Sequence, residues 1–193
     1  MKHPSLLAAL DCAVEEFSRR LVVVSGDQWE AATPCTDWNV RYLVAHVVGG
    51  NRFAALILDG AEVEEAMKVV MGTQQLGSNP MDDFNESVAA QRDGFGQAGA
   101  LERLVSHPLG DISGERFLRM RVFDVAVHAW DLAVAIGHDP DLDDGLVETV
   151  IDIVRHEAPG MGFGIEPCNE VGPDASNMER LLDLSGRCRP VHA

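Results

Sequence analysis

Basic residues are scarce in this sequence of 193 residues, which contains 15 Lys and Arg against 31 Asp and Glu and carries a formal net charge of −16. Proteins that bind a nucleic-acid backbone use clustered cations to displace counterions, and an anionic membrane surface repels a chain this acidic. Half of the net charge lies in residues 139–193, where twelve acidic residues stand against four arginines. The composition therefore excludes nucleic acids and anionic membranes as expected partners.

Long hydrophobic runs are also missing. Apolar runs such as residues 21–24 are far shorter than the roughly 20 apolar residues of a membrane-spanning helix. Near the N-terminus, Asp11, Glu15 and Glu16 precede any apolar run that could form the core of a signal peptide. We therefore expect a cytoplasmic protein without a membrane segment.

Closely spaced cysteine pairs are absent. The four cysteines, Cys12, Cys35, Cys168 and Cys188, are far apart and include no CxxC pair, which excludes a zinc-ribbon site. In a reducing cytoplasm, the expected state is four free thiols.

Alternating strand patterns and internal repeats are absent too, and helical periodicity dominates. Apolar residues recur at three- and four-residue steps, and Asn39 is a suitable N-cap for the second helix. The pattern predicts helices over residues 5–24, 40–58, 81–106, 116–136, 141–156 and 178–184. We expect an all-α fold in a single domain over residues 1–193: a four-helix bundle over residues 5–137, followed by a short acidic C-terminal appendage of helix and loop over residues 138–193.

The helix over residues 116–136 contains the most informative polar residues. From Val122 onward it is apolar on nearly every side, so it should be buried, yet Asp124 and His128 interrupt it one helical turn apart. A buried carboxylate costs several kcal/mol unless it is paired or bound to a metal. His46, on an apolar face of the second helix, could supply a third ligand. Two imidazoles and one carboxylate leave open positions on a metal, as reactive sites do.

Alternatives exist for each of these residues. His46 could be a hydrogen-bonded core histidine, and Asp124 with His128 could be a buried ion pair or an exposed helical pair. Asp131 could hydrogen-bond a ligand histidine or face water. Arg121, one turn before Asp124, could bind an anionic group of a substrate or be solvated.

Cys35 and two tryptophans surround these residues in the sequence. Cys35 stands in the loop before the second helix, and no histidine lies near it in the sequence, which favours a buried structural role over a nucleophilic one. Trp38 and Trp130 are expected to pack around the site.

Two segments carry a family resemblance. Residues 33–50, which include Pro34-Cys35 and His46, and residues 124–133, an acidic residue followed by His128 and Trp-Asp-Leu-Ala, are similar to the signatures of the mycothiol-dependent maleylpyruvate isomerase metal-binding domain family. That family belongs to the DinB-like superfamily of metal-binding four-helix bundles. Residues 179–187 resemble the short ending of its members.

The resemblance implies a divalent metal, zinc or nickel, held by His46, Asp124 and His128, and a small thiol such as mycothiol as a second partner. The isomerase itself uses Glu where this chain has Asp124, one methylene shorter. The substrate-binding C-terminal domain of the isomerase is not recognisable here, so maleylpyruvate isomerisation does not carry over.

The leading hypothesis is a thiol-dependent transferase or isomerase in which the metal activates a thiol that attacks an electrophilic substrate. A hydrolase whose metal activates water is the first alternative. A non-catalytic metal-binding or stress-response protein is the second, with its metal closed off by a fourth ligand such as Cys35 or His192. Two histidines and one carboxylate also suit non-haem iron. The bundle could also form a homodimer.

Overall fold

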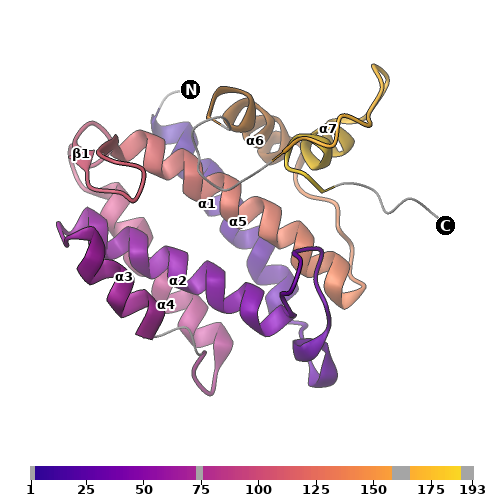
Figure 1. The fold of residues 1–193 in the computed structure, drawn as a ribbon, viewed down its shortest axis with the longest axis horizontal. Coiled ribbons are helices and arrows are strands. Elements are labelled where there is room, and N and C mark those ends of the chain that lie inside the picture. The colour runs from indigo at the N-terminus through magenta and orange to yellow at the C-terminus, as the bar shows by residue number, and fades with distance from the viewer. Residues whose placement is uncertain (1–2, 73–75, 158–165, 188–193) are drawn as a thin grey trace.

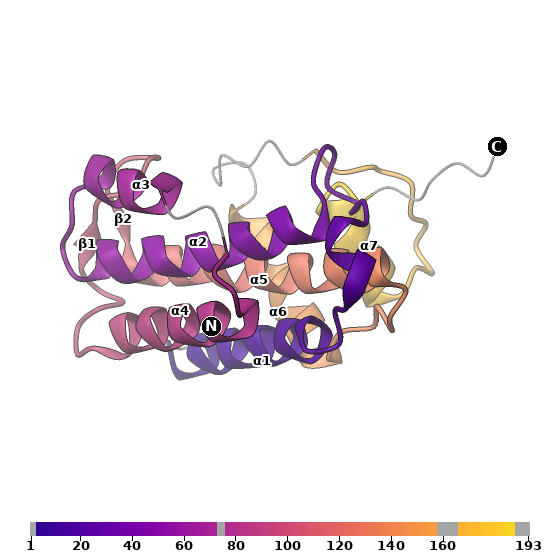
Figure 2. The same ribbon diagram turned by 90° about the horizontal axis from the view of Figure 1, so that it is seen from below.

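The computed structural model describes residues 3–72, 76–157 and 166–187. Four long helices run side by side along one direction, as Figures 1 and 2 show. The first packs on the last, the second packs on the third, and contacts between the second and the last join the two pairs. These helices are α1 (His3–Leu21), α2 (Val40–Leu58), α4 (Pro80–Gly96) and α5 (Gly114–Ile136). The expected all-α four-helix bundle is confirmed.

Shorter elements surround the bundle. Figure 2 shows α3 lying on the outer side of α2, next to a two-stranded antiparallel ladder in which β1 pairs with β2. Near the C-terminus, α6 packs against α5, and α7 packs against α6 (Figure 1). The bounds are η1 (Gly26–Glu30), α3 (Val63–Gly72), β1 (Leu104–Val105), β2 (Ile112–Ser113), α6 (Asp144–Glu157) and α7 (Asn177–Leu184).

Side-chain caps fix the starts of the two helices that carry the site. The Asn39 side chain accepts a hydrogen bond from the Tyr42 backbone N–H at the start of α2, which confirms the predicted N-cap. Ser113 caps α5 in the same way through the Arg116 N–H. Gly137, with φ of 67°, ends α5 in the left-handed conformation that glycine adopts without a steric penalty.

Two helix predictions differ from the structure. The predicted helix over residues 81–106 ends at Gly96, because Gly99 takes a φ of 75° and the chain turns there into β1. The turn brings Ala100 so close to the start of α5 that a Cβ at Gly114 would overlap the Ala100 carbonyl. The short helix α3 was not predicted; several of its apolar residues face solvent, including Met67, Val69 and Met71.

Helix α5 contributes a large share of the hydrophobic core. As expected from its sequence, α5 is buried along most of its length. From Met120 to Ala133 every residue is buried except Trp130, which is half-buried. Phe17 of α1 stacks on Phe84 of α4, with ring centroids 5.1 Å apart, and so connects these two helices. Of the helices in the described ranges, none combines the length and the apolar character needed to cross a membrane.

The cysteine expectation needs one correction. Cys12 and Cys35 are free thiols, but Cys168 is disulfide-bonded. Wide spacing in sequence did not exclude this, because the chain folds back here: the Cys168 N–H donates to the Asp183 carbonyl at the end of α7, at 2.9 Å. Cys188 lies outside the described residues.

Candidate metal centre

Three side chains from two helices converge on one point between α2 and α5. The Nε2 atom of His46 lies 3.2 Å from Asp124 Oδ1, and the Nε2 atom of His128 lies 3.5 Å from the same oxygen. One ligand atom from each residue falls within 4.8 Å of the other two. The side chains of Asp124 and His128 are 7% and 9% exposed, whereas that of His46 is 35% exposed. The predicted trio is therefore brought together, with its open side at His46.

The electrostatics of the trio keep Asp124 ionised and His128 protonated. Burial alone would raise the pKa of Asp124, but the Arg121 guanidinium and the two imidazoles outweigh it and hold the pKa of that carboxyl well below its ordinary value. Burial lowers the pKa of His128, and the Asp124 carboxylate more than compensates, so that pKa lies well above its ordinary value. A proton thus occupies His128 where a metal would compete for its lone pair. Two imidazole nitrogens and a carboxylate oxygen are a donor set that suits zinc, nickel and related divalent metals.

Asp131 orients His128 from behind. It is fully buried, and its Oδ2 lies 2.8 Å from His128 Nδ1, so the alternative in which Asp131 faces water is wrong. Since an ionised carboxylate only accepts hydrogen bonds, Nδ1 carries the proton and Nε2 is the atom left for a ligand. Burial raises the pKa of Asp131, but its bonds to His128 and Arg187 lower it further than burial raises it.

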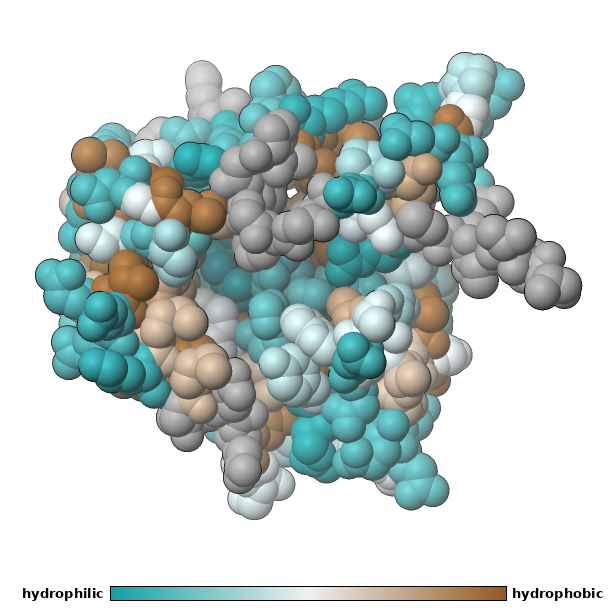
Figure 3. Space-filling model, viewed as in Figure 1, coloured by the Kyte–Doolittle hydropathy of each residue, from teal (hydrophilic) through white to brown (hydrophobic). Residues whose placement is uncertain are grey.

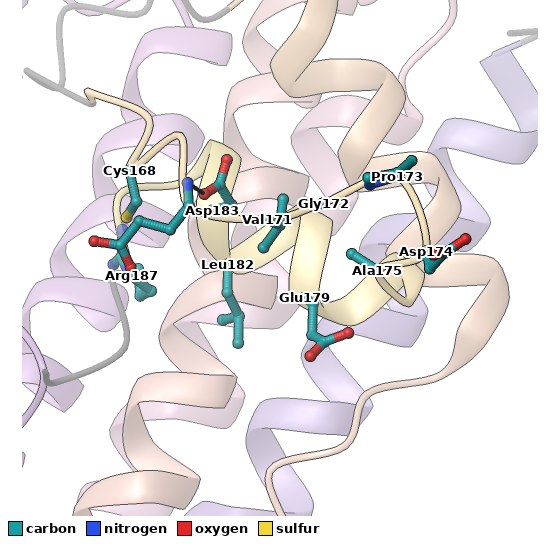
Figure 4. Close-up of a pocket in the computed structure, with 11 residues that line it drawn as sticks. Cys168, Val171, Gly172, Pro173, Asp174, Ala175, Glu179, Leu182, Asp183 and Arg187 are labelled. Carbon is teal, nitrogen blue, oxygen red and sulfur yellow. Dashed lines mark hydrogen bonds between the residues drawn. The ribbon is translucent and has the colours of Figure 1, made fainter. Parts of the chain in front are cut away.

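Arg187 is the residue that sequence reasoning missed. It reaches Asp131 from the C-terminal segment with two hydrogen bonds, Nη2 to Oδ2 at 2.8 Å and Nε to Oδ1 at 3.2 Å. Figure 4 shows it beside Cys168 and Asp183, at a cavity of 400 Å³ bounded by the turn before α7. Once Asp131 is known to be buried, a counter-charge is expected for it, but nothing in the sequence indicates that Arg187 supplies it.

Arg121 does not project into solvent. It is 6% exposed, its Nη1 donates to Asp124 Oδ2 at 2.8 Å, and its Nη2 donates to Asn51 Oδ1 at 2.7 Å. The guanidinium crosses α2 at Gly50, where a Cβ would lie 2.9 Å from Arg121 Cζ. The alternative of a solvated arginine is therefore wrong. Binding of a substrate anion stays a prediction, and both terminal nitrogens are bonded to other side chains.

A buried polar network around Arg121 connects α2, α4 and α5. Asn51 donates to Ser87 Oγ at 3.0 Å, and Arg121 Nε donates to Gln91 Oε1 at 3.4 Å. Such a network fixes the guanidinium only when its members are paired. Within the described residues, Gln91 Nε2 is a buried nitrogen without a hydrogen-bond partner.

Cys35 lies next to the site despite its distance in sequence. Its Sγ is 3.3 Å from Asp131 Oδ2 and 3.9 Å from His128 Nδ1, and its side chain is half-buried. No histidine lies near Cys35 in the sequence, but the loop between α1 and α2 folds back over the end of α5 (Figure 1) and brings the thiol next to His128. Cys35, His128 and Asp131 form a second group with metal-ligand spacing.

The tryptophans differ in their relation to the site. The Trp38 ring packs against both candidate histidines, with centroids 4.7 Å from His46 and 5.6 Å from His128, as expected. Trp130 is partly buried against the hydrophobic core.

Comparisons with known proteins agree with this architecture. The sequence model described as "Mycothiol maleylpyruvate isomerase N-terminal domain" matches residues 10–133. Two uncharacterized proteins of Mycobacterium tuberculosis, Rv0738 and MT0763, are 29% identical over 192 residues, which cover 94% of this chain and 98% of each relative. Crystal structures of the mycothiol-dependent maleylpyruvate isomerase and of a mutant of it align with a TM-score of 0.65 and 18% identity, covering 81% of this chain and 69% of the other. At that identity, the structural likeness establishes a common fold.

Proposed function

The chain belongs to the mycothiol maleylpyruvate isomerase N-terminal domain family, and on this basis we propose that it is a metal-dependent enzyme that joins a small thiol to an electrophilic substrate. His46, Asp124 and His128 hold the divalent metal, zinc or nickel, and mycothiol is the thiol that the family relation favours. The observation that carries the proposal is the convergence of these ligand atoms within 4.8 Å of one another, on a site open at His46.

The residues around the trio have separable roles. Bound at this site, a divalent cation lowers the pKa of a coordinated thiol and so supplies a thiolate at neutral pH. Asp131 keeps the proton of His128 on Nδ1, and Arg121 holds Asp124 in its ionised form. Trp38 covers the two imidazoles from the side of the α1–α2 loop and limits access of water there.

Two of the alternatives can be weighed against the geometry. A closed, non-catalytic metal site requires a fourth ligand near the trio, but the Cys35 thiol lies at the Nδ1 side of His128, away from the Nε2 atom that faces Asp124. His192, the other residue considered, lies outside the described residues. A hydrolase uses the same ligands and differs only in whether water or a thiol reacts, so a thiol-dependence assay separates the two.

Metal content after substitution tests the ligand set. His46→Ala should contain little metal, both as purified and after incubation with metal, because one of three ligands is lost. The variant should still fold, because the position is partly exposed. His156→Ala is the matched control, since that imidazole is 68% exposed and pairs with Asp152 on α6. Mass spectrometry of the loaded proteins measures the difference; equal metal content in both variants would refute the assignment.

Thiol dependence tests the reaction. Metal-loaded protein should consume an electrophile only when mycothiol is present, and the rate should disappear in His46→Ala. Consumption at the same rate without any thiol would instead identify the hydrolase.

A further inference from the structure

A second feature lies beside the metal ligands: a cavity of 380 Å³, within the size range of small-molecule sites. His46 and Asp124 form part of its wall, and so do Phe53 and Phe117. Each phenylalanine lies seven positions from one of these ligands on the same helix, which is two turns or about 10 Å along the axis. The cavity therefore extends from the metal ligands to an aromatic end.

In the part of the lining that the structure describes, that aromatic end carries no charge at neutral pH. His107, from the loop between β1 and β2, packs edge-on against Phe117 with ring centroids 5.2 Å apart and against Phe53 at 6.1 Å. Burial, and to a smaller degree Arg116, lower the pKa of His107 to about 4, so the imidazole is neutral. The remaining ionisable groups of the wall are Tyr42 and the residues around the metal site.

Arg121, the one cation among the described residues of the wall, is already engaged by Asp124 and Asn51. A carboxylate placed at the aromatic end would lose its hydration, which costs several kcal/mol in fully apolar surroundings. Among the described residues that line the cavity it would meet no further cation, and Arg116, the cation that acts on His107, lies outside the lining and pairs with Glu157 at 3.0 Å. An apolar group placed there has no charge to desolvate and loses no such hydration free energy.

Helix α3 completes the wall with flexible apolar side chains. Met67, Val70 and Met71 line the cavity, and Figure 3 shows hydrophobic residues gathered over this helix. Close packing of α3 on α2 depends on Gly49, where a Cβ would lie 3.1 Å from Val70 Cγ1. Methionine adapts to ligands of different shape, which suits a binding wall.

We propose that this cavity binds the electrophile of the reaction, an uncharged and largely apolar small molecule. Its reacting carbon lies toward His46 and Asp124, and its apolar body lies between α3 and the Phe53–Phe117 end. This rests on the proposed function. In the transfer, the thiolate sulfur bonds to the electrophilic carbon, the leaving group departs with the electron pair of the broken bond, and the thiol proton passes to solvent.

Matched probes test the charge preference. Methyl 4-chloro-3,5-dinitrobenzoate and its free carboxylate differ only at the position opposite the reacting carbon, and both lose chloride to a thiolate. Their unreactive analogues, with methyl in place of chlorine, measure binding alone by calorimetry, with metal-free and metal-loaded protein. We expect the neutral ester to bind about tenfold more tightly than the carboxylate, or better. Equal or tighter binding of the carboxylate overturns the proposal.

A substitution on α3 locates the bound probe. Met67→Arg places a cation in the wall and should shift the preference toward the carboxylate by about three- to fivefold, the range of a partly exposed ion pair. Val69→Arg is the matched control on the same helix, because Val69 is similarly exposed and does not line the cavity. A shift of equal size in the control overturns the placement of the ligand.

The two proposals fail in distinguishable ways. If the ester binds preferentially but the reactive probe is not joined to mycothiol by the loaded enzyme, the cavity assignment holds and the thiol-dependent reaction is wrong. If the reactive carboxylate is turned over as well as the ester, after correction for their rates with free thiol, the reaction holds and the apolar substrate class is wrong.

Discussion

Replacing Asp131 with Asn should weaken metal binding without removing any ligand. Asp131 is fully buried and holds His128 Nδ1 at 2.8 Å. Asparagine has nearly the same volume, but its neutral amide is a weaker acceptor and can also turn its NH₂ group toward the ring. Both effects reduce the fraction of His128 that presents a free Nε2 to the metal.

The expected loss is about 10- to 100-fold in metal affinity, or about 1.4–2.7 kcal/mol, as for other hydrogen-bond partners of ligand histidines. The same substitution also removes the carboxylate that pairs with Arg187, which keeps its bond to the Ser185 carbonyl. The Arg187 side chain is 16% exposed, so removal of the carboxylate should lower the free energy of unfolding by about 3 kcal/mol. Metal affinity and stability must therefore be measured separately.

Competition with a chromophoric chelator measures the affinity, and urea unfolding of the metal-free protein measures the stability. Arg187→Ala should lose stability but less metal affinity than Asp131→Asn, because Arg187 does not touch His128 itself and acts on it through Asp131 and Cys35. The double variant should be more stable than the sum of the single changes predicts, since neither partner is then left alone.

Asp183→Asn is the control for a purely structural effect. Asp183 is a buried carboxylate of the same C-terminal region, and it accepts the Glu170 N–H at 2.7 Å without touching His128. It should lose stability and keep its metal affinity. If Asp131→Asn and Asp183→Asn lowered metal affinity equally, the orienting role of Asp131 would be refuted.

Three further predictions concern pH and packing. Burial lowers the pKa of His128, but the neighbouring Asp124 carboxylate raises it further, so below that pKa a metal has to displace a proton and metal affinity should increase about tenfold per pH unit. In the metal-free protein, the stability that the charged ring contributes should be complete below pH 6.5 and lost as the pH rises through the raised pKa. Metal titrations with no pH dependence would contradict this account of His128. The lowered pKa of His107 should make the protein lose roughly 1–2 kcal/mol, after allowance for partial exposure, as the pH falls from 6.5 to about 4, and His107→Gln should remove this loss in urea melts. Gly50→Ala should displace Arg121 and cost about 1–3 kcal/mol, whereas Gly172→Ala, where a Cβ meets nothing within 4 Å, should change the unfolding midpoint little.

The site was predictable from the sequence where its residues share one helix. Asp124 and His128 stand one turn apart, and their burial followed from the apolar residues around them, so local geometry alone placed them on one face. His46 was identified by the same reasoning on α2. The fact that α2 and α5 bring the two sets together required knowledge of the bundle, which the family resemblance supplied.

Contacts made by tertiary packing could not be predicted from the sequence. Arg187 pairs with a residue 56 positions away, and Cys35 meets a ring 93 positions away. Nothing in the local pattern encodes those distances. Gly99, which turns the chain after α4, was indistinguishable in sequence from a glycine tolerated inside a helix.

The contact between Arg187 and Asp131 also bears on which stretch of chain is a working unit. The family match ends at residue 133, yet the cation that neutralises Asp131 comes from position 187. A fragment trimmed to the matched residues would keep the three candidate ligands and lose the guanidinium that pairs with the carboxylate behind them. Grafting this centre into another bundle, or exchanging tails between relatives, therefore has to carry the tail along with the helices.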